Sequence, residues 1–412
     1  MNSLFEDLKE RGYIYQMTNE EKIKEILDGE PQTIYLGIDP TADSLHIGHC
    51  FPLIVLRKMQ NAGHRIIVLI GGATAMIGDP TGKCDMRKMV TQEFIESNLE
   101  NVKKIIGKFL KFDGDNPAII VNNNDWFKNI NYIDFMRDVG VHFNVSKMLA
   151  SDACKTRMNG GGLTFFEMGY QLMQAYDFVH LNEEYGCRLQ IGGSDQWANI
   201  LAGVDYGRKL NYLAGKDEEA FQAMTVPLLT NSEGKKMGKT EKGAVWVLKE
   251  KLSPFEFYQY FYNVKDEDVE KLLKLLTSVP MSEIKELMSG DIRDAKQRMA
   301  YEITKFVHGK EDADDALNTS IEMFKKDNFE DAPEVTFDAN KFVDGMKLVD
   351  VMVEVAFFAS KSEARRMIEQ GAVSLNGQKV DNVDKTLSSA DFNNGELLLK
   401  RGKKTFLKVV LK

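Results

Sequence analysis

Short apolar runs alternate with longer amphipathic stretches along the first half of the chain. The apolar runs, each containing isoleucine together with valine or leucine, lie at residues 33–38, 65–70, 118–121 and 188–191. Helix-period patterns lie between them, for example at residues 51–62 and 93–112. Strands that alternate with helices in this way are typical of a mostly parallel sheet with helices on both faces. We therefore predict an α/β domain over residues 1–225, with ligands bound at the carboxyl ends of its strands.

The pattern changes near residue 253. Ser253, Pro254 and Glu256 form a strong helix start, with serine as the N-cap, proline at the first helical position and glutamate able to bond back to the cap. Helical periodicity then continues to residue 326. We predict a small all-helical domain over 253–326, joined to the first domain by a loop and connection at residues 226–252.

A polar, acidic stretch at residues 327–345, which includes Pro333, is typical of a linker. Beyond it, Ser360 to Glu363 has the pattern of a capping box that opens a short helix, and Asn376-Gly377 is the signature of a type I′ hairpin. A second hairpin is expected to turn at residues 401–404. These signals predict a small α+β domain over residues 346–412.

Charge is distributed unevenly between the body and this last domain. The whole chain has a net charge of −9, whereas residues 341–412 hold 13 Lys/Arg against 9 Asp/Glu. A basic appendage on an acidic body favours nucleic-acid binding by the appendage. Charge alone slightly favours the alternative, a solvated surface that has no partner.

Composition excludes several classes of protein. With 43% hydrophobic and 28% charged residues, the chain has the balance of a globular protein. No apolar run approaches the ~18 residues of a membrane span, and the first residues do not resemble a signal peptide. The four cysteines form no C-x-x-C pair, which argues against a zinc site or a disulfide framework and fits a reducing cytoplasm.

His46-Ile47-Gly48-His49 is the strongest candidate for chemistry. It follows the predicted strand 33–38 and stands at the start of the next helix, where free N–H groups and the helix dipole attract anions. Spacing of i and i+3 places both imidazoles on one helical face, where they could stabilise charge that builds on a phosphate. An isolated H-x-x-H more often caps local backbone groups. Metal binding is disfavoured because no nearby carboxylate follows in this helix.

A second candidate is Lys236-Met237-Gly238-Lys239-Thr240, a cationic segment preceded by Gly234. Mobile lysines between glycines are suited to clamping a phosphate chain as a reaction proceeds. Taken alone, such a segment is more often an exposed basic turn.

A polar stripe runs along the helix predicted around residue 175. Tyr170, Gln174 and Asp177 are spaced i, i+4 and i+7, so they share one face. Burying such a stripe costs free energy unless its members find hydrogen-bond partners, and a polar ligand would supply them. Tyr35, within the strand 33–38, is a further candidate, although a strand tyrosine is usually an ordinary core residue.

Together the two basic motifs resemble the HIGH and KMSKS signatures of class I aminoacyl-tRNA synthetases. HIGH is unaltered at residues 46–49, and KMSKS appears as KMGKT at 236–240, which differs at the third and fifth positions. With the polar stripe and Tyr35 added, essentially the whole chain resembles the bacterial tyrosyl-tRNA synthetases. The resemblance implies a Rossmann-like catalytic domain, a helical anticodon-binding domain and a C-terminal RNA-binding domain of the type named after ribosomal protein S-four.

The resemblance also implies roles for individual residues. Tyr35 and Asp177 would hydrogen-bond the phenolic hydroxyl of tyrosine, Tyr170, Gln174 and Asp79 would hold its ammonium group, and Gln196 would lie near its carboxylate, with Asn123 as a further pocket residue. The residues that would bind ATP or stabilise the transition state are Asp39, Thr41, His46, Gly48, His49, Lys83, Arg87, Gly193, Asp195, Lys236, Lys239 and Thr240. Candidate RNA contacts are Arg365, Arg366, Lys379, Lys400, Arg401, Lys403 and Lys404.

The reaction implied is attack of the tyrosine carboxylate on the α-phosphorus of ATP, followed by transfer of the tyrosyl group to tRNA(Tyr). Mg²⁺ would accompany ATP, with no tightly bound protein metal, and the enzyme would be a homodimer without DNA or membrane partners. A pocket that hydrogen-bonds a hydroxyl rejects phenylalanine, an effect for which tyrosyl-tRNA synthetases are themselves the standard example.

Three alternatives stay open from the sequence. A tryptophan enzyme of the same class would lack the pair Tyr35 and Asp177. An RNA-binding protein on a synthetase scaffold would have no need for an intact HIGH motif or for Lys239. A nucleotidyltransferase that acts without tRNA would have no use for the helical and basic appendages.

Overall fold

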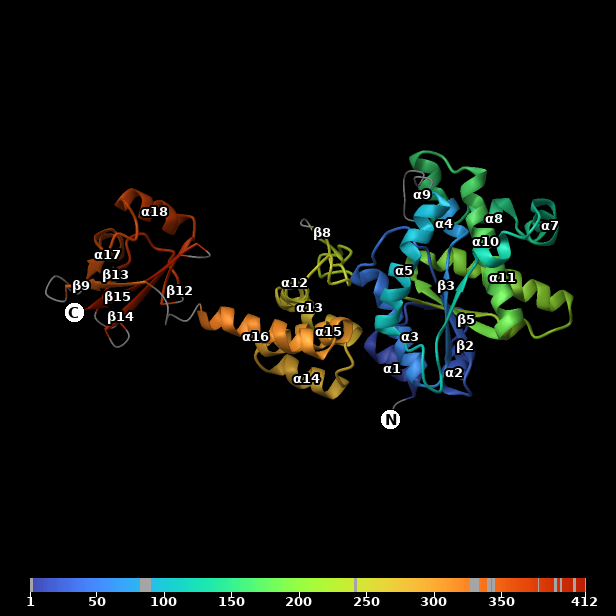
Figure 1. The fold of residues 1–412 in the computed structure, drawn as a ribbon, viewed down its shortest axis with the longest axis horizontal. Coiled ribbons are helices and arrows are strands. Elements are labelled where there is room, and N and C mark those ends of the chain that lie inside the picture. Colours follow the sequence, from blue (N-terminus) through green and yellow to red (C-terminus); the bar gives the residue numbers. More distant parts are fainter. Residues whose placement is uncertain are drawn as a thin grey trace. The chain divides into compact units, whose positions relative to one another are not determined.

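The computed structural model describes most of the chain and shows two compact units, Met1–Leu317 and Asn318–Lys412 (Figure 1). The described residues are 3–81, 90–240, 243–326, 333–338, 342, 345–376, 378–388, 391–392, 395–402 and 405–411. Within them, the side chains of residues 152–153, 239–240 and 322–326 are not described.

A six-stranded sheet lies at the centre of the first unit, in the order β1-β6-β5-β2-β3-β4. All neighbours are parallel except β1, which is antiparallel to β6. This arrangement confirms the mostly parallel sheet. The sequence predicted the second to fifth strands, two of them with their observed bounds, whereas β1 and β6 were not predicted. The strands are β1 Gln16–Met17, β2 Thr33–Ile38, β3 Arg65–Ile70, β4 Ile119–Asn122, β5 Cys187–Gly193 and β6 Gln222–Val226.

Helices cover both faces of this sheet, because alternate strand residues point to opposite sides. In β2, Ile34 and Leu36 pack in one core cluster with α3 (Ile47–Asn61) and α5 (Gln92–Phe109). Tyr35 faces the other way, into a cluster with α10 (Phe165–Tyr185) and α11 (Trp197–Leu213) (Figure 1). The remaining helices of this part are α1 Leu4–Arg11, α2 Glu20–Asp28, α4 Thr74–Ile77, α6 Asn124–Phe127, α7 Tyr132–Asp138, η1 Gly140–His142, α8 Val145–Leu149, α9 Asp152–Gly160, η2 Ser194–Gln196 and η3 Glu218–Ala220.

The helical region begins where the sequence predicted. The Ser253 hydroxyl accepts the Glu256 N–H at 3.2 Å, and the Glu256 carboxylate accepts the Ser253 N–H at 3.2 Å, so the capping box is complete. Its helices share a hydrophobic core with α3 and α5. The region comprises α12 Pro254–Tyr262, α13 Asp266–Leu276, α14 Met281–Ser289, α15 Ile292–His308 and α16 Lys310–Lys326.

The KMGKT segment lies between the sheet and the helical region. Lys239–Thr240 forms β7, which pairs antiparallel with β8 (Gly243–Ala244).

None of the helices in the described part of the chain combines the length and apolarity that a membrane crossing requires.

The second unit is a small α+β domain built on a five-stranded sheet in the order β12-β11-β14-β15-β9. Ser360 caps the helix α18, as predicted, but the Glu363 carboxylate accepts the Ala359 N–H at 3.2 Å in place of the Ser360 N–H that a capping box requires. The hairpins β11–β12 and β14–β15 occur at the predicted places. Part of the predicted linker, Glu334–Phe337, is instead the strand β9, because Phe337 is buried in the core of this domain. The elements are β9 Glu334–Phe337, β10 Met346–Lys347, α17 Leu348–Glu354, α18 Lys361–Glu369, β11 Val373–Leu375, β12 Gln378–Lys379, β13 Thr386–Leu387, β14 Glu396–Arg401 and β15 Thr405–Leu411.

Candidate active site

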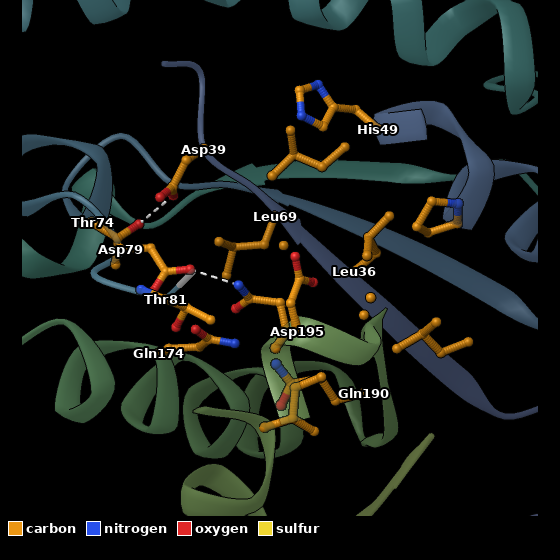
Figure 2. Close-up of a pocket in the computed structure, with 18 of the residues that line it drawn as sticks. Leu36, Asp39, His49, Leu69, Thr74, Asp79, Thr81, Gln174, Gln190 and Asp195 are labelled. Atoms are coloured by element: carbon orange, nitrogen blue, oxygen red, sulfur yellow. Dashed lines mark hydrogen bonds between the residues drawn. The ribbon is translucent and has the colours of Figure 1, made fainter. Parts of the chain in front are cut away.

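A cavity of about 310 Å³ opens at the carboxyl ends of β2 and β5 (Figure 2). These strands are neighbours in the sheet, but the chain leaves β2 toward β3 and β4 on one side and returns through β5 and β6 on the other. A reversal of strand order leaves a crevice between the connections, which is where open parallel sheets bind ligands. The predicted location of the site therefore coincides with an actual cavity.

The inner end of the cavity contains Tyr35 and Asp177. The Tyr35 side chain is 1% exposed, and its hydroxyl has no hydrogen-bond partner among the described residues. The Asp177 carboxylate accepts hydrogen bonds from Asn123 Nδ2 at 3.0 Å and from Trp126 Nε1 at 2.9 Å. Burial raises the pKa of Asp177 to about 7, although both hydrogen bonds favour its ionised form.

Asn123 connects this end to the mouth of the cavity through a chain of hydrogen bonds. Its Nδ2 also donates to Thr74 Oγ1 at 3.1 Å, and the Thr74 hydroxyl donates to Asp39 Oδ1 at 2.9 Å (Figure 2). The other Asp39 oxygen accepts the Tyr170 hydroxyl at 2.8 Å. The chain fixes the orientations of Asp39 and Tyr170 relative to Asp177.

Asp79 forms a second polar centre on the cavity wall. Its Oδ2 accepts Gln196 Nε2 at 2.6 Å (Figure 2). Its Oδ1 accepts the Thr81 N–H at 3.0 Å and Asn199 Nδ2 at 3.3 Å. The Asp79 side chain is buried, yet it faces the cavity. A buried carboxylate on a cavity wall is suited to receive a cationic group of a ligand.

Two glutamines on the cavity wall also have buried oxygens without partners. Gln174 Oε1 on α10 and Gln190 Oε1 on β5 have no hydrogen-bond donor in the described part of the protein. Both residues appear at the lower wall of the cavity in Figure 2. Buried polar atoms are normally hydrogen-bonded. The cavity is therefore prepared for a ligand that donates hydrogen bonds.

The two histidines of the first motif occupy different positions. His46 is the N-cap of α3, and its Nδ1 accepts the Gly48 N–H at 3.1 Å, so it has the capping role that an isolated motif would suggest. His49 is exposed, lines the cavity and stacks on His46 with ring centroids 3.7 Å apart. His49 is thus the histidine of the pair that is available to a ligand in the cavity.

The second motif reaches the same site. Lys236 Nζ lies 3.5 Å from Asp195 Oδ2, and Asp195 lines the cavity. Trp246, just past the motif, forms an isolated antiparallel bridge with His46. The side chains of Lys239 and Thr240, and the whole of Lys83 and Arg87, lie outside the described residues.

Most of the sequence-predicted site residues that are described meet around this one cavity. Asn123 and His46 stand behind its wall, next to Asp177 and His49 respectively. The predicted lining residues are Tyr35, Asp39, Thr41, Gly48, His49, Asp79, Tyr170, Gln174, Asp177, Gly193, Asp195 and Gln196.

Sequence reasoning missed five polar residues of the site, among them Thr81, whose N–H donates to Asp79. Gln190 lies within an apolar strand, where a lone buried amide was the available signal. Trp126, Thr74 and Asn199 act only through partners distant in sequence, so no local pattern could identify them.

The basic residues predicted for RNA binding differ in their surroundings. Arg365, Arg366 and Lys379 are exposed. The Arg401 guanidinium lies over the Phe358 ring, 5.0 Å from its centroid, and donates to the Phe357 carbonyl at 3.3 Å, which indicates a packing role as well. Lys400 Nζ lies over the Phe406 ring, at 4.7 Å. Lys403 and Lys404 lie outside the described residues.

No group of three or more His, Cys, Asp or Glu side chains is arranged to hold a metal ion in the described ranges. Oxygen-preferring cations such as Mg²⁺ are commonly bound by substrate phosphates with one or two carboxylates. Asp39 and Asp195 are the carboxylates that line the outer part of the cavity.

Comparison with known proteins gives consistent results for sequence and fold. A family model for class I tRNA synthetases (W and Y) matches residues 27–325, and one for the C-terminal domain of SYY-like tyrosine–tRNA ligases matches residues 325–409. The tyrosine–tRNA ligase of Acetivibrio thermocellus is 50% identical over 415 residues, across 100% of both chains. The tyrosine–tRNA ligase of Clostridium kluyveri is 48% identical over 416 residues, again across 100% of both chains.

Solved structures show the same likeness. A C-terminally truncated mitochondrial tyrosyl-tRNA synthetase of Aspergillus nidulans has a TM-score of 0.71 and 32% identity, and the match covers 79% of this chain and 95% of that chain. A tryptophanyl-tRNA synthetase of Encephalitozoon cuniculi has a TM-score of 0.53 and 17% identity, covering 76% of this chain and 91% of that chain. The second likeness shows a shared fold alone.

Proposed function

The chain belongs to the tyrosine–tRNA ligases of the class I tRNA synthetases, and we propose that the cavity between β2 and β5 is the site at which it activates tyrosine with ATP. The protein is an enzyme whose substrates are tyrosine, ATP and tRNA. The tryptophan alternative is set aside because the full-length relatives are tyrosine–tRNA ligases. The residue roles below are proposals.

One observation supports this assignment above all others: three buried oxygens without partners surround a single cavity. They belong to Tyr35, Gln174 and Gln190. Tyrosine has a phenol at one end, whose oxygen can accept from the Tyr35 hydroxyl, and an ammonium group at the other end, which can donate to a glutamine oxygen. A buried polar group that gains a hydrogen-bond partner recovers the free energy lost on its desolvation.

We propose that the phenol of tyrosine binds between Tyr35 and Asp177, with its O–H donated to the Asp177 carboxylate and the Tyr35 hydroxyl donated to the phenol oxygen. Asn123 and Trp126 hold that carboxylate in place from behind. Phenylalanine would leave the buried Tyr35 hydroxyl without a partner and the Asp177 carboxylate without the donor that the phenol supplies. Loss of a hydroxyl partner in a site built for it costs much more than loss of a methylene in an apolar pocket.

The ammonium group of tyrosine would contact Asp79, Gln174 and Tyr170 on the cavity wall. Gln196 would lie beside the carboxylate of tyrosine, and its present bond to Asp79 fixes its direction. A carboxylate is already a nucleophile at neutral pH. The first step therefore needs orientation and charge stabilisation more than it needs a general base.

ATP would occupy the outer part of the cavity. Asp195, Gly193 and Asp39 would meet the nucleoside, and Gly48 and the N-terminus of α3 would face the phosphates. His49, Thr41, Lys236, Lys239 and Thr240 would stabilise the charge that develops as pyrophosphate leaves, and Lys83 and Arg87 would add to this stabilisation. Mg²⁺ would enter bound to the ATP phosphates, where it neutralises their charge.

The second unit would hold the tRNA. Arg365 and Arg366 lie one after the other on α18 with exposed side chains, as contacts to a phosphate backbone require. Lys379, Lys400, Lys403 and Lys404 would extend this surface. The helical region 253–326 would meet the anticodon part of the same tRNA.

We also propose that the enzyme is a homodimer. Four large apolar side chains along α7, η1 and α8 are more than half exposed: Tyr132, Ile133, Val141 and Val145. Such a concentration on consecutive short helices is typical of a surface covered by a second subunit. Sedimentation of Val141→Lys tests this, since an unchanged dimer in that variant would move the interface elsewhere.

Pyrophosphate exchange into ATP tests the whole assignment. Exchange should be stimulated by tyrosine and by neither phenylalanine nor tryptophan, and Gln190→Leu should reduce the stimulation by raising the KM for tyrosine. Exchange that is equal for tyrosine and phenylalanine would contradict the proposed phenol site. Absence of exchange with tyrosine in an enzyme that still binds tRNA would favour an RNA-binding role.

A further inference from the structure

The segment that carries KMGKT, here called the lysine loop (residues 230–245), is tied to the first motif by backbone bonds. The Ile47 N–H donates to the Val245 carbonyl at 3.0 Å, and the Val247 N–H donates to the Leu45 carbonyl at 3.3 Å. The carboxyl-terminal side of the lysine loop is thereby fixed beside the start of α3. Its amino-terminal side pairs with itself through the bridge between Thr230 and Lys236, and the Met237 N–H donates to the Leu229 carbonyl at 2.7 Å.

Helix α13 of the helical region holds that side. Lys271 Nζ donates to the Thr230 carbonyl at 2.7 Å and to the Thr230 hydroxyl at 3.0 Å. The Ser232 hydroxyl donates to Asp268 Oδ2 at 3.4 Å, one helical turn from Lys271. Lys271 is half-buried, so water screens this ammonium group less than it screens a fully exposed lysine. Two bonds from one ammonium group fix the point where the lysine loop leaves the sheet domain.

Helix α12 contacts the middle of the lysine loop. Tyr260 lines a surface pocket together with Met237 and Val245 of the lysine loop, and its hydroxyl lies close to the Gly238 N–H, within KMGKT itself. Gly238 has φ +97°, and a Cβ added there would lie 2.5 Å from His46 Nδ1. A serine at this third position of the motif would therefore collide with the His46 ring and would strain the backbone. Glycine allows the loop to lie directly against the first motif, and Tyr260 lies next to the same part of the loop.

We propose that Lys271 and Tyr260 are positioning residues that hold the lysine loop against the first motif, so that the helical region sets the geometry of the phosphate site. Neither side chain lines the cavity. The inference rests on the proposed role of Lys236 and Lys239 in activation. It goes beyond that role by assigning control of the loop to two residues of a different region.

The consequence should appear in one step of the reaction. Tyrosine contacts the inner cavity, which these residues do not touch, so its binding should be unaffected. ATP phosphates need the loop lysines in a narrow range of positions, and small displacements of reacting groups have large effects on rate. Loosening the loop should therefore slow adenylate formation and raise the KM for ATP.

The experiment uses the full-length enzyme with Lys271→Met, Lys271→Arg and Tyr260→Phe. Matched controls are Lys274→Met, which removes a lysine of the same helix that pairs with Glu270, and Tyr301→Phe, which removes a hydroxyl bonded to Asp314. Single-turnover rates of tyrosyl-adenylate formation are measured with the KM values for ATP and tyrosine. Hydrogen exchange of peptides from residues 229–247 is measured alongside.

We expect Lys271→Met to slow adenylate formation about tenfold and Tyr260→Phe about threefold, because a charge-assisted bond contributes more than a neutral one. Lys271→Arg should keep most of the wild-type rate of adenylate formation. The KM for tyrosine should be unchanged in all three variants. Exchange should rise in residues 229–247 and nowhere else. General destabilisation would instead raise exchange across the whole first unit, and that result would overturn the proposal.

Rates within twofold of wild type for both Lys271→Met and Tyr260→Phe, with unchanged exchange in the loop, would also overturn it. Lys239→Ala separates this failure from failure of the proposed function. If Lys239→Ala slows adenylate formation and Lys271→Met does not, only the positioning role is lost. If Lys239→Ala has no effect either, the assignment of the lysine loop to activation is itself wrong.

Discussion

Replacing Tyr35 by phenylalanine should make the free protein more stable and the enzyme less selective. The hydroxyl is buried, faces the cavity and has no hydrogen-bond partner among the described residues. A buried polar group without a partner costs about 1–3 kcal/mol, so its removal should stabilise the fold by roughly 1 kcal/mol if water in the cavity satisfies it in part. For a unit of this size that corresponds to a rise of about 1–3 °C in Tm.

Binding should change in the opposite direction. The lost hydrogen bond to the phenol is neutral and contributes about 0.5–1.5 kcal/mol, which is a decrease of roughly 3- to 10-fold in kcat/KM for tyrosine. Phenylalanine makes no such bond, so its kcat/KM should be unchanged or slightly higher. The ratio of the two values is the quantity to measure, by pyrophosphate exchange with each amino acid.

Tyr13→Phe is the matched control. Tyr13 is equally buried, but its hydroxyl donates to the Leu275 carbonyl at 3.0 Å, far along the chain from the cavity residues. Its removal should lower Tm and leave selectivity unchanged. If Tyr35→Phe lowers Tm as Tyr13→Phe does, the hydroxyl has a partner in the free enzyme and the reasoning from an unpaired atom is refuted.

Three further outcomes are expected. His49→Ala should slow adenylate formation about a hundredfold, because a hydrogen-bond donor to the transition state is lost, whereas the Kd for tyrosine should stay nearly unchanged. Unchanged single-turnover rates in this variant would remove His49 from the mechanism. The pKa of Asp177 is about 7, and the carboxylate is the form that accepts the phenol, so the KM for tyrosine should rise about tenfold from pH 8 to pH 6. Asp177→Asn should abolish this pH dependence, and a pH dependence that persists in that variant would assign it to another group. Arg365→Glu combined with Arg366→Glu should reduce tRNA charging at least tenfold and spare adenylate formation, and charging that is unchanged at every salt concentration would exclude α18 from the tRNA surface.

The proposed positioning role of Lys271 and Tyr260 would couple the helical region to the lysine loop. Helices α12 to α15 share a hydrophobic core with α3 and α5, and all of these helices lie in the first unit. Because of this shared core, a contact formed on α12 or α13 can change the position of Gly238. Such coupling between the helices and the lysine loop requires two arrangements of the loop, and the hydrogen-exchange measurement on residues 229–247 would detect them.

The local sequence determined the elements and the chemistry of the site. Strands β2 and β3 are continuous apolar runs, which a strand buried on both faces requires, and their bounds were predicted correctly. The cap at Ser253 and the start of α3 at His46 depend on neighbouring residues only, and both occur as predicted. The stripe of Tyr170, Gln174 and Asp177 lines the cavity because helical spacing fixes which side chains share a face.

Tertiary structure alone decided what these residues contact. The bond from Trp126 to Asp177, the chain through Thr74, and the unpaired Gln190 oxygen depend on strands and helices that meet only after folding. The same holds for Lys271 and Thr230, which lie 41 residues apart in the chain. Side-chain periodicity depends on local geometry, whereas hydrogen-bond partners depend on strand order and helix packing. The sequence therefore indicated the location of the candidate site. The fold determined which of its polar groups have hydrogen-bond partners within the described part of the protein and which have none.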